Sequence, residues 1–79
     1  MSSHKIIVFT QPDSLPCEAV KMFLKSRRAR FEERNVASDD AARDELARKY
    51  NSRSTPTVVI DNEVVVGFDP ERLDQLLEP

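Results

Sequence analysis

The sequence predicts an α/β protein with the element order β-α-β-α-β-β-α, in which a four-stranded mixed sheet is flanked by three helices. Short apolar runs rich in β-branched residues alternate with longer segments whose apolar residues recur at helical spacing. The pair Asp61-Asn62 lies between two strand-like runs and is typical of a tight hairpin turn. We expect the first two strands, which are joined by a helix, to be parallel with a right-handed crossover, and the hairpin to be antiparallel.

The first half of the chain predicts a strand, a helix and a weaker strand. Residues 5–9 (KIIVF) are apolar and partly β-branched, which predicts a buried strand. Residues 15–27 carry an apolar stripe at helical spacing, made of Ala19, Val20, Phe23 and Leu24. Residues 31–36 (FEERNV) are more polar, and we expect a second strand to begin at Phe31.

Residues 38–50 (SDDAARDELARKY) predict the second helix. We expect Ser38 to cap it, with Asp39 and Asp40 near the positive end of the helix dipole. Acid-before-base pairs four residues apart support the helix: Asp39–Arg43, Asp44–Arg48 and Glu45–Lys49. The inward face is predicted to consist of Ala42, Leu46 and Tyr50.

The second half predicts a hairpin and a last helix. Residues 57–66 (TVVIDNEVVV) form the hairpin, which the only glycine, Gly67, closes. Asp69-Pro70 is typical of an N-cap followed by a proline in the first helical turn. The last helix is lined by Leu73, Leu76 and Leu77.

Length and composition restrict the class of protein. The 79 residues predict a single domain spanning 1–79, and the net charge of −2 gives no general attraction to nucleic acid or acidic membranes. The basic cluster at 26–30 (SRRAR) is expected to be a solvated helix end. Neither a signal peptide nor a membrane span is expected, because every apolar run is too short. One cysteine excludes an intramolecular disulfide, and one cysteine with one histidine offers no zinc-ligand cluster. We expect a monomeric, cytoplasmic protein without a metal.

Residues 10–17 (TQPDSLPC) follow the first strand, where small α/β sheets place their sites. Pro16 suits the first helical turn, which puts Cys17 near the positive end of the helix. That end and Lys21 favour a thiolate, whereas neighbouring acidic side chains oppose it. The alternative stays open, because a free cysteine is more often a small buried apolar residue.

Ser14 can serve as the N-cap of the same helix by accepting from the N–H of Cys17. A serine nucleophile would need a base, and His4 lies at the far end of the first strand, where we expect a solvated terminal residue. A serine-hydrolase site is therefore not expected. Thr55-Pro56 precedes a strand and can be a trans turn or a cis bond that directs the backbone of Thr55 toward the site.

The segments FTQPDSLPC and STPTVVIDNEVVVGFDPERLDQLL resemble a glutaredoxin-like member of the thioredoxin superfamily, over nearly the whole chain. The most specific parts are the T-x-P-x-[Cys]-x-x-C turn and the T-P-x-V-V-I strand entry. The resemblance implies a thioredoxin fold and a thiol–disulfide oxidoreductase that carries electrons in cell redox homeostasis.

The hairpin and the following G-F-x-P are similar to those of small proteins that serve ribonucleotide reductase. The resemblance therefore implies protein disulfides as partners, ribonucleotide reductase among them. It implies glutathione or a thioredoxin-reductase-type protein as reductant, and no tightly bound cofactor.

The resemblance also assigns the site residues. Ser14 occupies the attacking-cysteine position and Cys17 the resolving one. Pro56 matches the family's cis-proline, and Thr55 matches the residue whose backbone pairs with a bound thiol substrate. Arg53 falls where some members contact a glutathione carboxylate. The other binding positions implied are Gln11, Gly67, Phe68 and Asp69.

This sequence departs from the family pattern in ways that matter. Serine cannot form a disulfide, so Ser14, whether natural or introduced, impairs the dithiol cycle. Only the family resemblance therefore implies that this chain is an enzyme. Gln11 stands where members often carry a lysine, and Pro70 stands where glutathione users often carry an aspartate. Both departures weaken the case for glutathione binding, and the loop G-F-D-P at 67–70 is more similar to the branch served by thioredoxin reductase.

Two alternatives to a dithiol enzyme stay open. One is a non-catalytic thioredoxin-fold module that binds partners in the groove beside Pro56. The other is one-cysteine chemistry, which requires an exposed Cys17.

Overall fold

The computed structural model describes residues 4–78 and contains four strands and three helices. In chain order they are β1 (Ile6–Thr10), α1 (Leu15–Ser26), β2 (Glu32–Asn35), α2 (Asp40–Lys49), β3 (Thr57–Ile60), β4 (Glu63–Val66) and α3 (Pro70–Leu77). The strands form one sheet in the order β2-β1-β3-β4. β2 is parallel to β1, whereas β1 with β3 and β3 with β4 are antiparallel. The predicted element order and the mixed sheet of a thioredoxin-like fold are confirmed.

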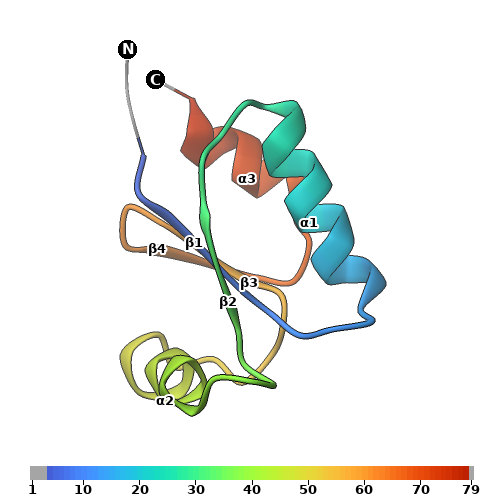
Figure 1. Cartoon of the computed structure of the whole chain (residues 1–79). Helices are drawn as coiled ribbons and strands as arrows, with labels where there is room; N and C mark the ends of the chain where they lie inside the picture. Colours follow the sequence, from blue (N-terminus) through green and yellow to red (C-terminus); the bar gives the residue numbers. More distant parts are fainter. Residues whose placement is uncertain (1–3, 79) are drawn as a thin grey trace.

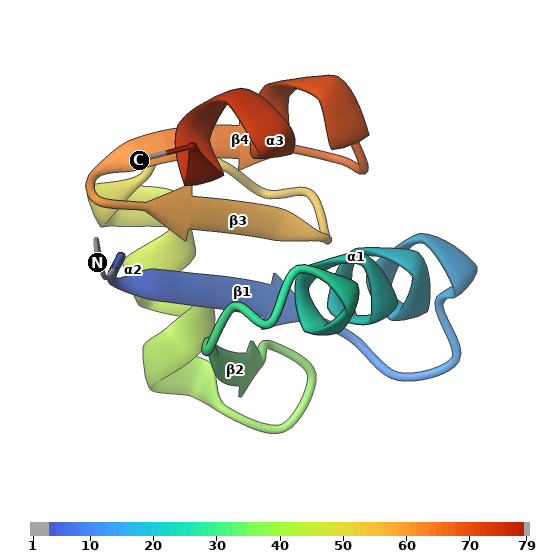
Figure 2. The ribbon, with the colours of Figure 1, turned by 90° about the horizontal axis from the view of Figure 1, so that it is seen from above.

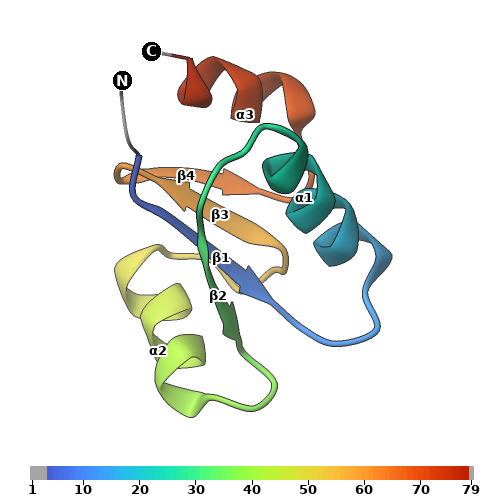
Figure 3. The same cartoon turned by 45° about the horizontal axis from the view of Figure 1, so that its top comes forward.

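The sheet separates two layers of helices (Figures 1 and 3). Helices α1 and α3 cover one face and α2 covers the other. Because alternate residues of a strand point to opposite faces, β1 supplies both cores. The core on the α1 and α3 side contains Ile6, Val8, Val20, Leu24, Val58, Ile60, Val65 and Leu73. The core on the α2 side contains Ile7, Phe9, Ala42, Leu46 and Val59, with Tyr50 packed against it as predicted.

The hairpin turn matches the prediction. Asp61 and Asn62 have φ angles of 49° and 77°, so both central residues are left-handed. Such turns match the right-handed twist of the strands that they join.

Helix α2 differs from the prediction at its start. Asp39, not Ser38, is the N-cap, and its carboxylate accepts from the N–H groups of Ala41 at 3.0 Å and Ala42 at 3.2 Å. The predicted cap was therefore wrong by one residue.

The predicted acid–base pairs of α2 are absent from the ion pairs of residues 4–78. Arg43 bonds to Asp40 at 2.7 Å, and Glu45 bonds to Arg34 of β2. The carboxylate of Asp39 is occupied by capping, and a neighbouring strand offers Glu45 a guanidinium group. Tertiary contacts therefore override the spacing along the helix.

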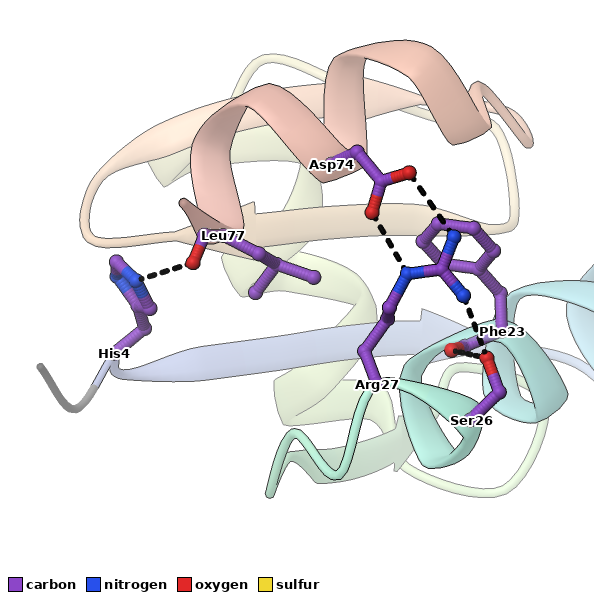
Figure 4. Close-up of polar contacts among 6 residues, drawn as sticks. All are labelled: His4, Phe23, Ser26, Arg27, Asp74 and Leu77. Carbon is purple, nitrogen blue, oxygen red and sulfur yellow. Dashed lines mark hydrogen bonds and ion pairs between the residues drawn. The ribbon is translucent and has the colours of Figure 1, made fainter. Parts of the chain in front are cut away.

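His4 corrects another prediction, because its side chain is only 18% exposed. Its Nδ1 bonds to a carboxylate oxygen of Asp61. Its Nε2 lies 3.3 Å from the carbonyl oxygen of Leu77 (Figure 4). Asp61 also accepts from the backbone N–H of Lys5 at 2.9 Å. His4 thus connects the start of β1, the hairpin and the end of α3.

A second contact joins α1 to α3. The Arg27 guanidinium donates to both carboxylate oxygens of Asp74, at 2.9 and 3.0 Å (Figure 4). It also lies over the ring of Phe23, 4.3 Å from the ring centroid.

No helix within residues 4–78 is long and apolar enough to cross a membrane.

Candidate functional site

Strand register brings the candidate residues to one end of the sheet, which we call the site edge. Phe9, near the end of β1, pairs with Thr57, the first residue of β3, and Thr57 pairs with Val66, the last residue of β4. The turn after β1, the loop before β3 and the loop after β4 therefore meet at this edge. Figure 2 shows these three connections at the same end of the sheet.

The turn after β1 ends in a capped helix. Ser14 has an extended backbone, with φ −116° and ψ 115°, and its hydroxyl accepts from the N–H of Cys17 at 3.3 Å. The carbonyl of Ser14 accepts from the N–H of Glu18 at 3.1 Å. This bond confirms the predicted cap. Cys17 is the donor because the proline that precedes it has no N–H to offer.

Exposure distinguishes the two positions of the S-L-P-C turn. The side chain of Ser14 is partly exposed, whereas Cys17 is only 1% exposed. The structure therefore supports the interpretation of Cys17 as a buried small residue. One-cysteine chemistry at an exposed Cys17 is contradicted.

The Lys21 ammonium is engaged by carboxylates. It lies 2.8 Å from Glu18 and 3.2 Å from Glu33, and these hydrogen bonds raise its pKa. The hydroxyl of Thr10 donates to Glu33 at 2.8 Å and, with a smaller contribution from Lys21, holds the pKa of that carboxyl below its usual value. The sequence predicted that Lys21 would favour a thiolate, but its hydrogen bonds are made to the two carboxylates.

The loop before β3 is held by hydroxyl groups. The peptide bond between Thr55 and Pro56 is cis, the side chain of Pro56 is buried and Thr55 is partly buried. The hydroxyls of Ser52 and Thr57 lie 2.9 Å apart, and Thr57 also donates to the carbonyl of Ser54 at 2.7 Å. Sequence reasoning missed Ser52 and Thr57, although the density of hydroxyl residues around Pro56 in SRSTPT was a signal.

The loop after β4 lies against the same proline. The N–H of Gly67 donates to the carbonyl of Pro56 at 2.8 Å. Gly67 has φ +83°, a left-handed conformation that disfavours side chains, although a Cβ there would meet nothing within 4 Å. Phe68 is 41% exposed, and its ring lies edge-on to Phe23 at 5.9 Å. Asp69 caps α3 by accepting from the N–H of Arg72 at 3.1 Å, so the predicted cap is confirmed.

Gln11 and Arg53 lie apart from the other candidates. Both are exposed, and both line a hollow on the α2 side of the site edge. The candidate residues thus fall into two groups: those around the S-L-P-C turn and Pro56, and those that face α2. Within residues 4–78, no group of three or more His, Cys, Asp or Glu side chains could hold a metal ion.

A mixed sheet whose edge combines a capped helix start, a buried cysteine and a proline before the third strand defines a thioredoxin-fold protein. The family model described as Glutaredoxin matches residues 6–65. The chain belongs to the glutaredoxin family.

Several proteins resemble the chain over nearly its full length. A glutaredoxin-like 8.6 kDa protein of the rubredoxin operon of Clostridium pasteurianum is 32% identical over 73 residues, which cover 92% of this chain and 97% of that protein. The crystal structure of the thioredoxin-like protein BC3987 is similar at 57% identity and a TM-score of 0.90, covering 92% of this chain and 100% of the other. The glutaredoxin-like NrdH-redoxin of Escherichia coli is 29% identical with a TM-score of 0.81, covering 95% and 96%.

Proposed function

We propose that the chain carries the site of a glutaredoxin-like thiol–disulfide oxidoreductase, an electron carrier whose attacking position is held by Ser14. The observation that carries this proposal is the placement of Ser14. Its partly exposed side chain caps α1 at the sheet edge that also holds Thr55 and Pro56, and buried Cys17 lies one helical turn further on. Membership of the glutaredoxin family supports this class of chemistry.

The reaction needs sulfur at position 14. A thiolate there would attack a partner's disulfide, forming a mixed disulfide and releasing one partner thiolate. Cys17, after losing its proton, would attack the sulfur at position 14 and release the second partner thiolate. The partner gains two electrons and the chain becomes an intramolecular disulfide. The oxygen of Ser14 cannot form the first bond, so the dithiol cycle is impaired in this chain.

Partners and setting are part of the same proposal. Protein disulfides, ribonucleotide reductase among them, are the substrates, and the backbone of Thr55 pairs with the bound partner. Either glutathione or a thioredoxin-reductase-type protein returns the electrons. Gln11 and Pro70 weaken the case for glutathione, and the loop G-F-D-P at 67–70 favours the second reductant. The described thioredoxin-like activity profile of NrdH-redoxin is consistent with that choice. We infer a monomeric, single-domain protein of the cytoplasm without a tightly bound cofactor.

The test is the Ser14→Cys variant, assayed for reduction of a protein disulfide and of a glutathione mixed disulfide. We expect turnover that the unaltered chain lacks. A Ser14→Cys/Cys17→Ala control should form one equivalent of mixed disulfide with a protein disulfide and then stop. A Ser14→Cys protein that folds normally and yet reduces neither substrate would refute the proposal.

A second candidate function is a non-catalytic binding module. The observation that favours it is the exposure of apolar side chains near the site edge, where Leu15 is 84% and Phe68 41% exposed. Such a module would hold an extended partner segment beside Pro56 by backbone hydrogen bonds. It should bind its partner equally well as the Cys17→Ala variant, and loss of binding in that variant would count against it.

A further inference from the structure

The sheet ends on one side at β4, whose outer side pairs with no strand within residues 4–78. We call this outer side the β4 edge; it runs along the strand, whereas the site edge lies at the strand ends. An unpaired strand offers backbone N–H and C=O groups to another extended chain, and charged side chains commonly prevent such pairing. The strand at the other side of the sheet, β2, is rich in charge, but β4 is one glutamate followed by three valines.

Strand register shows which backbone groups of β4 point outward. The N–H of Gly67 donates to the carbonyl of Pro56 at 2.8 Å, and Val66, one residue earlier, lies opposite Thr57. In an antiparallel ladder, hydrogen-bonded pairs alternate with pairs whose backbone groups point away from the neighbouring strand. The N–H and C=O groups of Val66 and Val64 therefore point outward. No loop backbone group within residues 4–78 bonds to either residue.

The same two residues carry the exposed apolar side chains of β4. Val64 and Val66 are 39% and 55% exposed, whereas Val65 is buried in the core with Leu73 of α3. Val64 lies opposite Val59, which places both exposed valines on the α2 face of the sheet. No β4 residue belongs to the core that α2 covers. Free backbone groups and uncovered apolar side chains therefore coincide at positions 64 and 66.

Charge indicates which kind of chain fits the β4 edge. Four carboxylates flank it: Asp61 and Glu63 at the hairpin end, and Asp69 and Glu71 at the start of α3. Within residues 4–78 their ion pairs are limited to His4 and Arg72, so the flanks keep an acidic excess. Antiparallel pairing with a second copy would bring the acidic flanks together, and like charges across strands are destabilising. A basic segment would instead meet opposite charge at both ends.

We propose that the β4 edge binds an extended, basic segment of another protein as a fifth strand. Val64 and Val66 would each exchange two backbone hydrogen bonds with one residue of an antiparallel partner. Those two partner residues lie on the α2 face, where β-branched side chains would cover the valines. Partner lysine or arginine side chains beyond them face the acidic flanks, one directly opposite Glu63. This surface lies outside the thiol–disulfide site and does not depend on the reaction proposed there.

The first test uses the unaltered chain and the heptapeptide KKVTVKK, blocked at both termini, whose two valines would lie opposite Val64 and Val66. NMR follows the hydrogen exchange of backbone amides. At a peptide concentration about ten times Kd, exchange of the Val64 and Val66 N–H groups should slow about tenfold, because only the free fraction exchanges. The exposed amides of β2 should exchange at unchanged rates. No binding of the peptide, or unchanged exchange at Val64 and Val66, would overturn the proposal.

Two modified peptides separate the backbone from the charges. Methylation of the two valine nitrogens keeps the side chains and removes two N–H donors, which should weaken binding by about tenfold or more. EEVTVEE reverses the charges and should bind at least about fivefold more weakly, since cross-strand charge pairs contribute that much. An unchanged affinity of the methylated peptide would refute strand addition, and an unchanged affinity of EEVTVEE would refute the basic partner.

Variants locate the surface. Val64→Lys should weaken KKVTVKK binding about fivefold, through lost apolar contact and repulsion of the peptide lysines. Met22→Lys is the matched control, because Met22 is 69% exposed on α1, across the sheet, and gains the same charge. It should keep the affinity, and equal losses in both variants would assign binding to net charge and overturn the proposal. If Val64→Lys does not fold, the peptide comparison with the unaltered chain decides.

A dilution series without peptide tests the other occupant. The NMR signals of Val64 and Val66 should not change with protein concentration. Shifts confined to these two residues as concentration rises would show that a second copy occupies the β4 edge, and would overturn the proposal of a basic partner.

Discussion

The two ends of the sheet are held together by different kinds of contact. At the site end, the loop before β3 is fixed by the paired hydroxyls of Ser52 and Thr57. At the opposite end, the first strand, the hairpin and α3 are joined through the ring of His4, with Asp61 as its charged partner. Neutral hydrogen bonds do not titrate between acidic and neutral pH, whereas ion pairs depend on pH and on salt.

This difference has a functional meaning. Because neutral groups order the loop before β3, we expect the order of that loop to depend little on pH or salt. At the opposite end of the sheet, the Asp61 carboxylate bonds to His4 and to the backbone N–H of Lys5. We therefore expect stability to respond to pH and salt mainly through contacts remote from the site, and the following predictions test that division.

The largest effect is expected for Thr57→Val, which keeps the side-chain shape and removes the hydroxyl. Thr57 is fully buried, and the change leaves the buried hydroxyl of Ser52 without its partner. The free energy of unfolding should fall by about 1–3 kcal/mol. Urea unfolding measures it, and the loss should be the same at low and high salt.

A double-mutant cycle checks that the two hydroxyls act as a pair. Ser52→Ala combined with Thr57→Val should cost less than the sum of the single variants, because each single change already breaks the shared bond. Strict additivity would show that the two hydroxyls are not coupled.

Ser14→Ala should lower the free energy of unfolding by about 1 kcal/mol, because α1 loses its N-cap acceptor. Ser14→Asn supplies another acceptor and should retain most of the stability. Urea unfolding of the three proteins makes the comparison. If alanine and asparagine are equally destabilising, the cap contributes nothing.

Arg27→Gln should have a smaller effect that depends on salt. The hydrogen bonds with Asp74 raise the pKa of Arg27 and lower that of Asp74, but both side chains are close to half exposed. The urea midpoint should fall at low ionic strength, and less so at about 1 M salt, where the Debye length is about 3 Å. A loss that does not change with salt would assign the effect to packing on the ring of Phe23.

The smallest effect is expected for the pH dependence of the contact between His4 and Asp61. Bonding to the Asp61 carboxylate raises the pKa of His4 above 6.5, and the same contact lowers the pKa of Asp61. The contribution of His4 is complete below the unfolded pKa of about 6.5 and is lost as pH rises through the higher folded value. The contribution of Asp61 is complete above about 3.9 and is lost as pH falls through its lowered folded value.

NMR titration of the imidazole measures this pKa directly, because His4 is the only histidine. Asp61→Asn should return it toward its ordinary value. If the pKa of His4 is the same in Asp61→Asn as in the unaltered chain, Asp61 does not influence His4.

Much of the fold could be predicted from the sequence because local chemistry decides it. Asp61 and Asn62 tolerate left-handed conformations, so the hairpin turn follows from two residues. The prediction of the second strand was weaker because β2 is polar. Its residues Glu32–Asn35 form a strand by pairing with β1, and the spacing of apolar residues cannot show such pairing. His4 was mispredicted for a similar reason, since its partner is 57 residues away.

The candidate site was predictable in part. The cap at Ser14 follows from the proline before Cys17, which leaves one donor for the hydroxyl. The hollow beside α2 could not be found in this way, because its walls come from four separate segments. Whether an arginine meets a carboxylate depends on how α2 lies against the rest of the chain, and Glu45 illustrates this by bonding to Arg34 of a neighbouring strand.

The burial of Cys17 bears on how the molecule can be labelled. Its sulfur is the chain's only thiol, and the packed start of α1 encloses it. A maleimide or iodoacetamide reagent should therefore react first with any cysteine introduced on the surface. A fluorophore or spin label could then be attached at one chosen position with Cys17 left in place, and native Cys17 would become reactive only when α1 opens.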